Sequence, residues 1–141
     1  ISGRLEKMLR EWVEEQHLGE VYDAPTDVVL SEHNVVQPDI FYISRERLGI
    51  IKVANIQGAP DMVVEILSPN SLEWDRVTKR HLYAKYGVRE FWVVDPEGRT
   101  IEVTVLRGRE LATLQVYPTG TTLVSPLLPG LQVPIDQVFG Q

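Results

Sequence analysis

A carboxylate stands in the middle of a stretch that otherwise looks buried. Residues 58–68 read GAPDMVVEILS, and turn-forming residues bound the stretch at both ends. Side chains alternate in a strand, so both faces of this stretch would be apolar, with Asp61 at its start and Glu65 in its middle. A buried carboxylate is costly unless it is paired, hydrogen-bonded or bound to a metal. Glu65 is therefore the strongest functional signal in the chain.

A second carboxylate interrupts the predicted strand from Val35 to Ile43. Asp39 would share one face of that strand with Phe41 and Ile43. Pro38 cannot donate to a strand ladder, which predicts that the strand begins at a sheet margin or a bulge. Pairing of Asp39 with an arginine at such a margin is the structural alternative to a functional role.

The segment after the Glu65 strand is predicted to be a helix over residues 72–87. Asn70 or Ser71 would cap its start, and Gly87 would end it. At about 100° per residue, one side of this helix carries an apolar stripe that should face the sheet. The stripe consists of Leu72, Leu82, Tyr83 and Tyr86.

Two charged residues of this helix, Asp75 and Lys79, fall inside the apolar stripe. They lie four residues apart, so they can form an ion pair along the helix while the Lys79 ammonium reaches water. The helix must also pack beside the strand that carries Glu65. The second interpretation, equally open, is that Lys79 points at this buried carboxylate.

These residues together indicate metal-assisted hydrolysis. Asp39, Asp61, Glu65 and Lys79 are predicted to converge at one end of a mixed sheet, although Asp61 could instead cap a turn. Clustered carboxylates raise one another's pKa unless a cation intervenes. With oxygen ligands, no cysteine and scattered histidines, that cation would be Mg²⁺ or Mn²⁺. A lysine beside it suits phosphodiester hydrolysis, while two carboxylates alone would also suit a glycosidase.

The remaining pattern predicts an α/β protein with a central mixed sheet. A helix over residues 2–17 would end at Gly19, and short strands would follow up to Ile43. Strand, helix and strand between residues 61 and 95 are predicted to form a parallel crossover, with residues 91–95 as its second strand. Residues 100–117 are predicted to form an antiparallel meander, and residues 135–139 a last helical turn.

Composition limits the classes of protein that remain. The 141 residues suit one domain, and no apolar run approaches the length of a membrane span. The absence of cysteine fits a reducing cytoplasm. A net charge of −6 disfavours broad, non-specific attraction to nucleic acid. The chain begins with Ile1, so we expect a native N-terminal segment to be missing.

Several motifs in this order resemble one family. They are QPDIFYI, GAPDMVVEILSPNS, DRVTK, LYAKYGVREFWVVDP and LLPGLQVP, and the match runs from about Leu5 to Phe139. The chain resembles the Uma family of restriction-endonuclease-like proteins, within the PD-(D/E)XK nuclease superfamily. The resemblance implies a restriction-endonuclease-like α/β core, a divalent metal site and a nuclease-type active centre.

The resemblance also implies roles for particular residues. Asp39 matches the first metal-binding aspartate, and Glu65 matches the acidic member of the (D/E)-x-K element. Leu67 occupies the lysine position of that element, and the family pattern moves the lysine to Lys79 on the following helix. Asp61 is expected among the metal ligands, although its family position has a less clear role, and Asp75 and Tyr83 are expected to support the site. A further glutamate, expected before the N-terminal helix, has no counterpart.

Two functions follow from these expectations. The first is a Mg²⁺-dependent DNA endonuclease with Asp39 and Glu65 as ligands and Lys79 stabilising the transition state. The second is a catalytically degenerate nuclease fold that serves as a binding or partner module, consistent with the acidic charge and with Leu67. Cutting of both strands would favour a two-fold homodimer.

Overall fold

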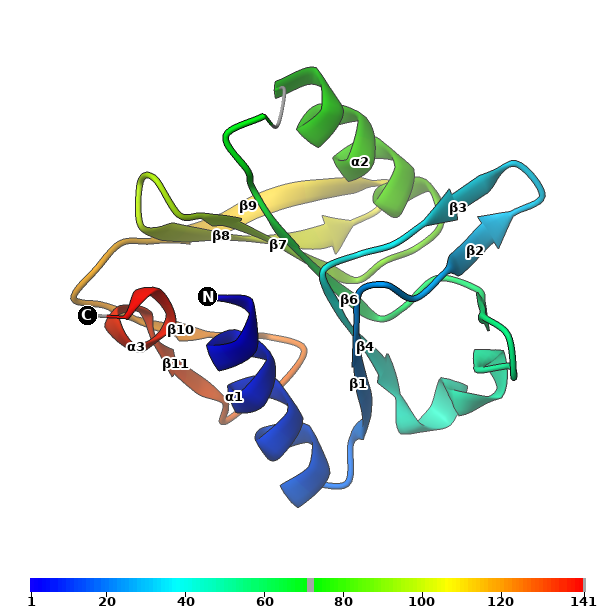
Figure 1. Cartoon of the computed structure of the whole chain (residues 1–141), viewed down its shortest axis with the longest axis horizontal. Coiled ribbons are helices and arrows are strands. Elements are labelled where there is room, and N and C mark those ends of the chain that lie inside the picture. Colours follow the sequence, from blue (N-terminus) through cyan, green and yellow to red (C-terminus); the bar gives the residue numbers. More distant parts are fainter. Residues whose placement is uncertain (71–72, 141) are drawn as a thin grey trace.

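A six-stranded mixed sheet forms the centre of the molecule (Figure 1). The computed structural model describes residues 1–70 and 73–140. The strands lie in the order β1 (Gly19–Asp23), β4 (Ile40–Ser44), β6 (Met62–Ile66), β7 (Glu90–Asp95), β8 (Thr100–Arg107) and β9 (Glu110–Tyr117). Only β6 and β7 pair in parallel among these strands, and the other neighbours are antiparallel. The predicted α/β class, the parallel crossover and the antiparallel meander are confirmed.

Helices cover both faces of the sheet (Figure 1). Helix α2 (Glu73–Lys85) connects β6 to β7 and packs on one face. On the other face lie α1 (Ser2–Glu15), α3 (Ile135–Phe139) and the hairpin of β10 (Thr122–Val124) and β11 (Gln132–Pro134). In the described part of the chain, no helix has the length and apolar character needed to cross a membrane.

The alternation of side chains divides the interior into two cores. Met62 and Val64 of β6 belong to the core on the α1 side, whereas Val63 packs with Tyr83 and Phe91 on the α2 side. This alternation was predicted from the sequence and is confirmed. It directs the side chain of Glu65, which shares a face with Val63, toward α2.

The predicted strand from Val35 to Ile43 is two strands. The first half, β3 (Asn34–Val36), belongs to a small sheet with β2 (Val28–Ser31) and β5 (Ile56–Gln57), and the second half is β4. Pro38 lies between the halves and is buried. Because proline has no N–H to donate, the ladder breaks there and the chain changes sheets. The segment after β4 forms a short 3₁₀ helix, η1 (Arg45–Ile50).

The sequence predicts that a glycine ends each of two helices, and one of these two predictions is wrong. Gly87 has φ +83°, and the Val88 N–H reaches back to the Tyr83 carbonyl, which is the geometry of a glycine helix stop. Gly19 instead starts β1, where a Cβ would collide with the carbonyl oxygen of Ile43. At the start of α2, the predicted cap at Ser71 and the stripe residue Leu72 lie outside the described residues.

Candidate functional site

Asp39 and Glu65 lie next to each other on the α2 face of the sheet. The antiparallel register of β4 and β6 pairs Phe41 with Val63 and Ile40 with Val64, and its next step places Asp39 opposite Glu65. The Asp39 carboxylate accepts a hydrogen bond from the Ile66 N–H at 2.7 Å. Asp39 Oδ2 is therefore fixed against the end of β6, beside the Glu65 carboxylate.

Helix α2 contributes a phenol and an amine to this pair. The Tyr83 hydroxyl donates a hydrogen bond of 2.5 Å to Glu65 Oε2, and Lys79 Nζ lies 3.6 Å from the same oxygen. These two residues are four apart, so they occupy successive turns of one helix face. The Lys79 side chain is 37% exposed, which leaves its amine accessible from solvent. Of the two interpretations of Lys79, the structure shows the contact with Glu65.

Burial raises the pKa of Glu65, and the negative charge of Asp39 adds to this rise. The Tyr83 hydrogen bond, the Lys79 charge and the Asp39 backbone N–H oppose it without cancelling it. Burial and Glu65 also raise the pKa of Tyr83, so the phenol keeps its proton and acts as a donor. A positive ion between the two carboxylates would relieve the repulsion that these groups experience.

A small cavity of about 40 Å³ opens beside this cluster. Its lining includes Glu65 and Lys79, together with Asp75 one turn before Lys79. Asp75 is half-buried at the position that the helical stripe predicted. The structure thus brings together five predicted site residues, which are Asp39, Glu65, Asp75, Lys79 and Tyr83.

Asp61 does not join this cluster. It precedes β6 and lies four residues before Glu65, which corresponds to about 13 Å along a strand. Its carboxylate accepts a hydrogen bond from the Ser44 N–H at 2.6 Å and pairs with Arg47 at 3.3 Å and Arg89 at 3.9 Å. The expected convergence of Asp61 with the other carboxylates is therefore corrected. Asp61 is a buried structural anion at the opposite end of β6.

Asp61→Asn should lower the free energy of unfolding by about 1–2 kcal/mol, because the two ion pairs are lost while an amide oxygen can still accept from Ser44. Both arginines are partly exposed and can hydrate after the change, which limits the loss. Urea denaturation measures the change. Any stabilisation of the protein by Mg²⁺ should remain as in the unmodified chain, and its loss would return Asp61 to the ligand set.

The donor set suits a hard divalent ion that needs few protein ligands. In the described residues no group of three or more His, Cys, Asp or Glu side chains is placed to hold a metal. Asp39 and Glu65 supply two adjacent carboxylates, and Mg²⁺ often binds through one or two carboxylates while water and substrate phosphates complete its shell. The residues present therefore fit Mg²⁺ or Mn²⁺ and do not fit a closed zinc site.

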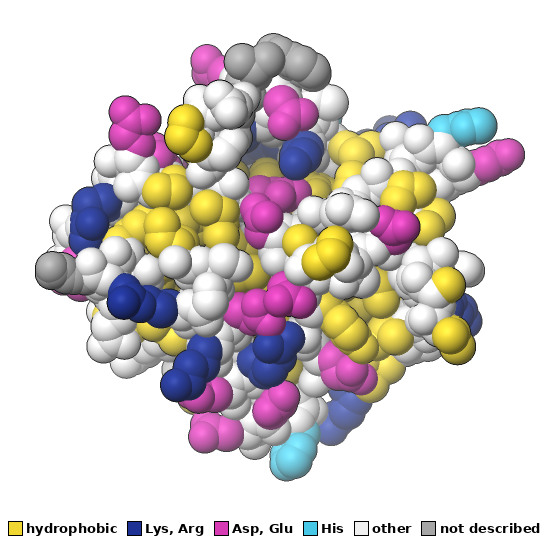
Figure 2. Space-filling model, viewed as in Figure 1, with side chains coloured by type: hydrophobic (Ala, Val, Ile, Leu, Met, Phe, Trp, Pro, Cys, Tyr) yellow, Lys and Arg dark blue, Asp and Glu magenta, His cyan; other side chains and the backbone are white. Residues whose placement is uncertain are grey.

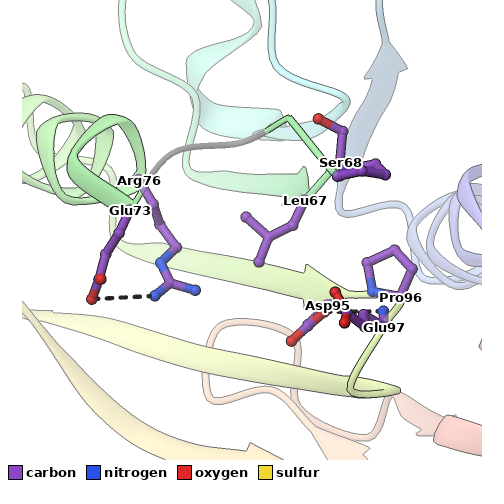
Figure 3. A pocket seen from close by; sticks show the side chains of 8 residues that line it. Leu67, Ser68, Glu73, Arg76, Asp95, Pro96 and Glu97 are labelled. Carbon is purple, nitrogen blue, oxygen red and sulfur yellow. Dashed lines mark hydrogen bonds and ion pairs between the residues drawn. The ribbon is translucent and has the colours of Figure 1, made fainter.

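A groove of about 370 Å³ continues from the small cavity. Leu67 and Arg76 line both spaces, so the groove begins where the carboxylate cluster ends. In Figure 3, Arg76 and Glu73 reach in from α2, and Asp95, Pro96 and Glu97 lie on the opposite side. Figure 2 shows acidic side chains gathered near the middle of the face below α2, with lysine and arginine side chains beside them.

Sequence reasoning missed Glu90, the most deeply buried carboxylate on the α1 side among the described residues. It is 1% exposed and accepts hydrogen bonds from Trp92 Nε1, the Ser125 hydroxyl and the Leu127 N–H. The strand predicted over residues 91–95 begins one residue after Glu90 and leaves this carboxylate outside, whereas β7 includes it. A strand beginning one residue earlier would have revealed another buried carboxylate. The three donors indicate that Glu90 has a structural role. Its side chain lies with Trp92 on the α1 side of the sheet.

Comparisons with known proteins agree with this architecture. The family model Uma2, described as "Putative restriction endonuclease", matches residues 1–136. Among solved structures, "a putative nuclease belonging to DUF820" from Anabaena variabilis aligns with a TM-score of 0.79 at 20% identity, covering 98% of this chain and 77% of that one. No curated protein gave a match. The structural likeness shows the fold, a nuclease fold, and the family match covers nearly the whole chain. The chain therefore belongs to the Uma2 family of restriction-endonuclease-like proteins.

Proposed function

We propose that the protein is a nuclease that hydrolyses DNA phosphodiester bonds with Mg²⁺ or Mn²⁺. The observation that carries this proposal is the position of Lys79 Nζ, 3.6 Å from a buried carboxylate that stands beside a second one. The Lys79 amine is partly exposed, so it can donate both to Glu65 and to a phosphate oxygen bound beside the two carboxylates. The family and the fold support the same reaction class.

Each side chain has a distinct task in this proposal. Asp39 and Glu65 hold the ion through the carboxylate oxygens that their protein hydrogen bonds leave free. When bound, the ion supplies a water of lowered pKa and neutralises phosphate charge. Lys79 stabilises the negative charge that develops on the phosphate, since its partly exposed amine can donate to an oxygen in the cavity. Tyr83 is a positioning residue, because its hydrogen bond fixes the orientation of Glu65.

The first experiment measures thermal unfolding with and without Mg²⁺ or Mn²⁺. A ligand that binds only the folded protein raises its Tm, by about 4 °C when the ion is at roughly ten times its Kd. Glu65→Gln should abolish this rise, because the amide keeps the shape of the side chain and removes the charge that attracts the ion. The matched control is Glu110→Gln, an exposed carboxylate at the start of β9. An unchanged Tm in the unmodified protein at millimolar ion would refute the metal site.

A second candidate function is a binding or partner module that has kept the fold and lost the reaction. The observation that favours it is Leu67, a half-buried apolar residue at the position where the superfamily resemblance places a lysine. The two candidates differ in one measurement, the cleavage of plasmid and single-stranded DNA in Mg²⁺. A metal-stabilised protein that leaves both substrates intact would be the binding module.

A further inference from the structure

The groove beside the carboxylate cluster occupies a position where α/β proteins commonly bind ligands. It lies beyond the carboxyl ends of β6 and β7, the parallel pair of the sheet, and beside the first turns of α2. In open α/β sheets, ligands commonly bind beyond the carboxyl ends of the strands. None of the residues assigned above to the metal or to Lys79 chemistry lines this groove.

The groove and the proposed site share a wall. Arg76 lines both, and it lies three residues before Lys79 on α2, a separation of about 4.5 Å along the helix axis. Successive phosphates of one strand advance by about 3.4 Å along a duplex. A strand whose phosphate faces Lys79 would therefore bring a neighbouring phosphate within reach of Arg76.

The two sides of the groove differ in charge: the α2 side carries the ion pair of Arg76 with Glu73, whereas the turn carries carboxylates. On the α2 side, Arg76 is 39% exposed and its pair with Glu73 is long, at 4.0 Å. On the other side, Asp95 Oδ1 accepts the N–H groups of Glu97 and Gly98 at 3.0 and 3.1 Å, which fixes its carboxylate in the turn. Arg76 is the basic side chain among the described residues that line the groove, so an anion would be held at Arg76 and repelled from the turn (Figure 3).

The floor between these sides is apolar. Leu67 lies between Arg76 and the acidic turn in Figure 3, and Pro69 and Pro96 also line the groove. Flat apolar surfaces suit the face of a nucleobase, and carboxylates accept hydrogen bonds from the amino groups of bases. A nucleotide carries a phosphate anion, a planar base and hydrogen-bond donors on the edge of that base. The groove offers a basic group, an apolar surface and a carboxylate in the same order.

We propose that this groove is the subsite for the nucleotide next to the cleaved bond, with Arg76 binding its phosphate and the base lying over Leu67 toward Asp95. This inference rests on the proposed nuclease function and assigns part of its substrate contact. Arg76 then contributes to binding of the strand and not to the bond-breaking step.

The test is Arg76→Gln, assayed by steady-state cleavage of fluorescein-labelled single-stranded DNA in Mg²⁺ over a series of salt concentrations. Loss of one charged contact to phosphate should raise KM about tenfold and leave kcat within about twofold. The slope of log KM against log salt concentration should fall by about 0.7, the contribution of one phosphate contact in a single strand. A residue with a merely structural role would not change the salt slope.

The matched control is Arg109→Gln, in the exposed turn between β8 and β9. The register of β7 with β8 places that turn at the opposite end of the strands from Asp95. KM and salt slope of Arg76→Gln equal to those of this control would overturn the inference and leave the nuclease function standing. A fall in kcat at constant KM would also overturn it. A wild-type protein that cleaves no DNA would refute the function first, and the subsite with it.

Discussion

Lys79→Ala is expected to lower kcat for DNA cleavage by about 10²–10³-fold while KM changes little. The reason is geometric: Lys79 Nζ lies 3.6 Å from Glu65 Oε2, at the mouth of the small cavity where the phosphate would lie. Removing a donor that acts on charge developed in the transition state affects the rate more than binding. The measurement is steady-state cleavage of a plasmid in Mg²⁺ over a series of plasmid concentrations, which gives kcat and KM separately.

The matched control for this prediction lies on the same helix. Lys85 is exposed and contacts the ring of Tyr86 at 5.5 Å, so Lys85→Ala removes an equal charge away from the carboxylates. It should cleave at the wild-type rate. Lys79→Arg should recover part of the loss, because it keeps the charge and changes its position. Equal rates for Lys79→Ala and Lys85→Ala would contradict the role of Lys79 in the reaction.

Glu90→Ala should have the largest effect on folding, a loss of about 3–5 kcal/mol in the free energy of unfolding. The change removes the acceptor for the Trp92 indole at 2.7 Å, the Ser125 hydroxyl at 2.5 Å and the Leu127 N–H at 3.1 Å. It also leaves a cavity at a position that is 1% exposed. Urea denaturation with linear extrapolation gives the value.

The same variant has a predictable pH dependence. Burial raises the pKa of Glu90 above its usual value of 4.5, so the folded state holds this proton more tightly than the unfolded chain does. The stabilising contribution of Glu90 is complete below the unfolded pKa and declines as pH rises through the folded pKa. The difference in stability between wild type and Glu90→Ala should therefore be greater at pH 4 than at pH 7. Glu110→Ala, at an exposed position, should change stability by less than about 0.5 kcal/mol at either pH.

Periodicity predicted that Glu65, Lys79 and Tyr83 lie on facing surfaces, and it left open whether the Lys79 amine points to Glu65 or to water. The alternation in β6 assigned Glu65 to one face, and the helical stripe assigned Lys79 and Tyr83 to the side of α2 that faces the sheet. Such predictions succeed because each depends on a repeat within one element and on a single parallel crossover. The register that places Asp39 beside Glu65 follows from β4 and β6 being neighbours, for which the resemblance to a family was the stronger guide.

The roles of Asp61 and Glu90 depend on partners that are distant in the sequence. Asp61 meets Arg89 and the Ser44 N–H, and Glu90 meets Ser125 and Leu127, which lie 35 and 37 residues further along the chain. No local pattern connects such groups, since they come together only when the sheet is assembled. A carboxylate inside an apolar strand can therefore be recognised from the sequence. Whether it serves as an ion-pair partner, a hydrogen-bonded anchor or a metal ligand depends on the tertiary structure.

The charged amine of this site, Lys79, lies on helix α2, whereas Glu65 lies on β6 and Asp39 directly precedes β4. Tyr83 and Lys79 join the two parts across a packing interface, so the arrangement exists only while α2 is docked on the sheet. Local opening of that helix disassembles the centre without unfolding the sheet. By thermodynamic linkage, a ligand bound at this centre stabilises the docked helix and must slow amide hydrogen exchange in α2. A change that weakens the docking of α2 must lower the affinity for that ligand by the same factor.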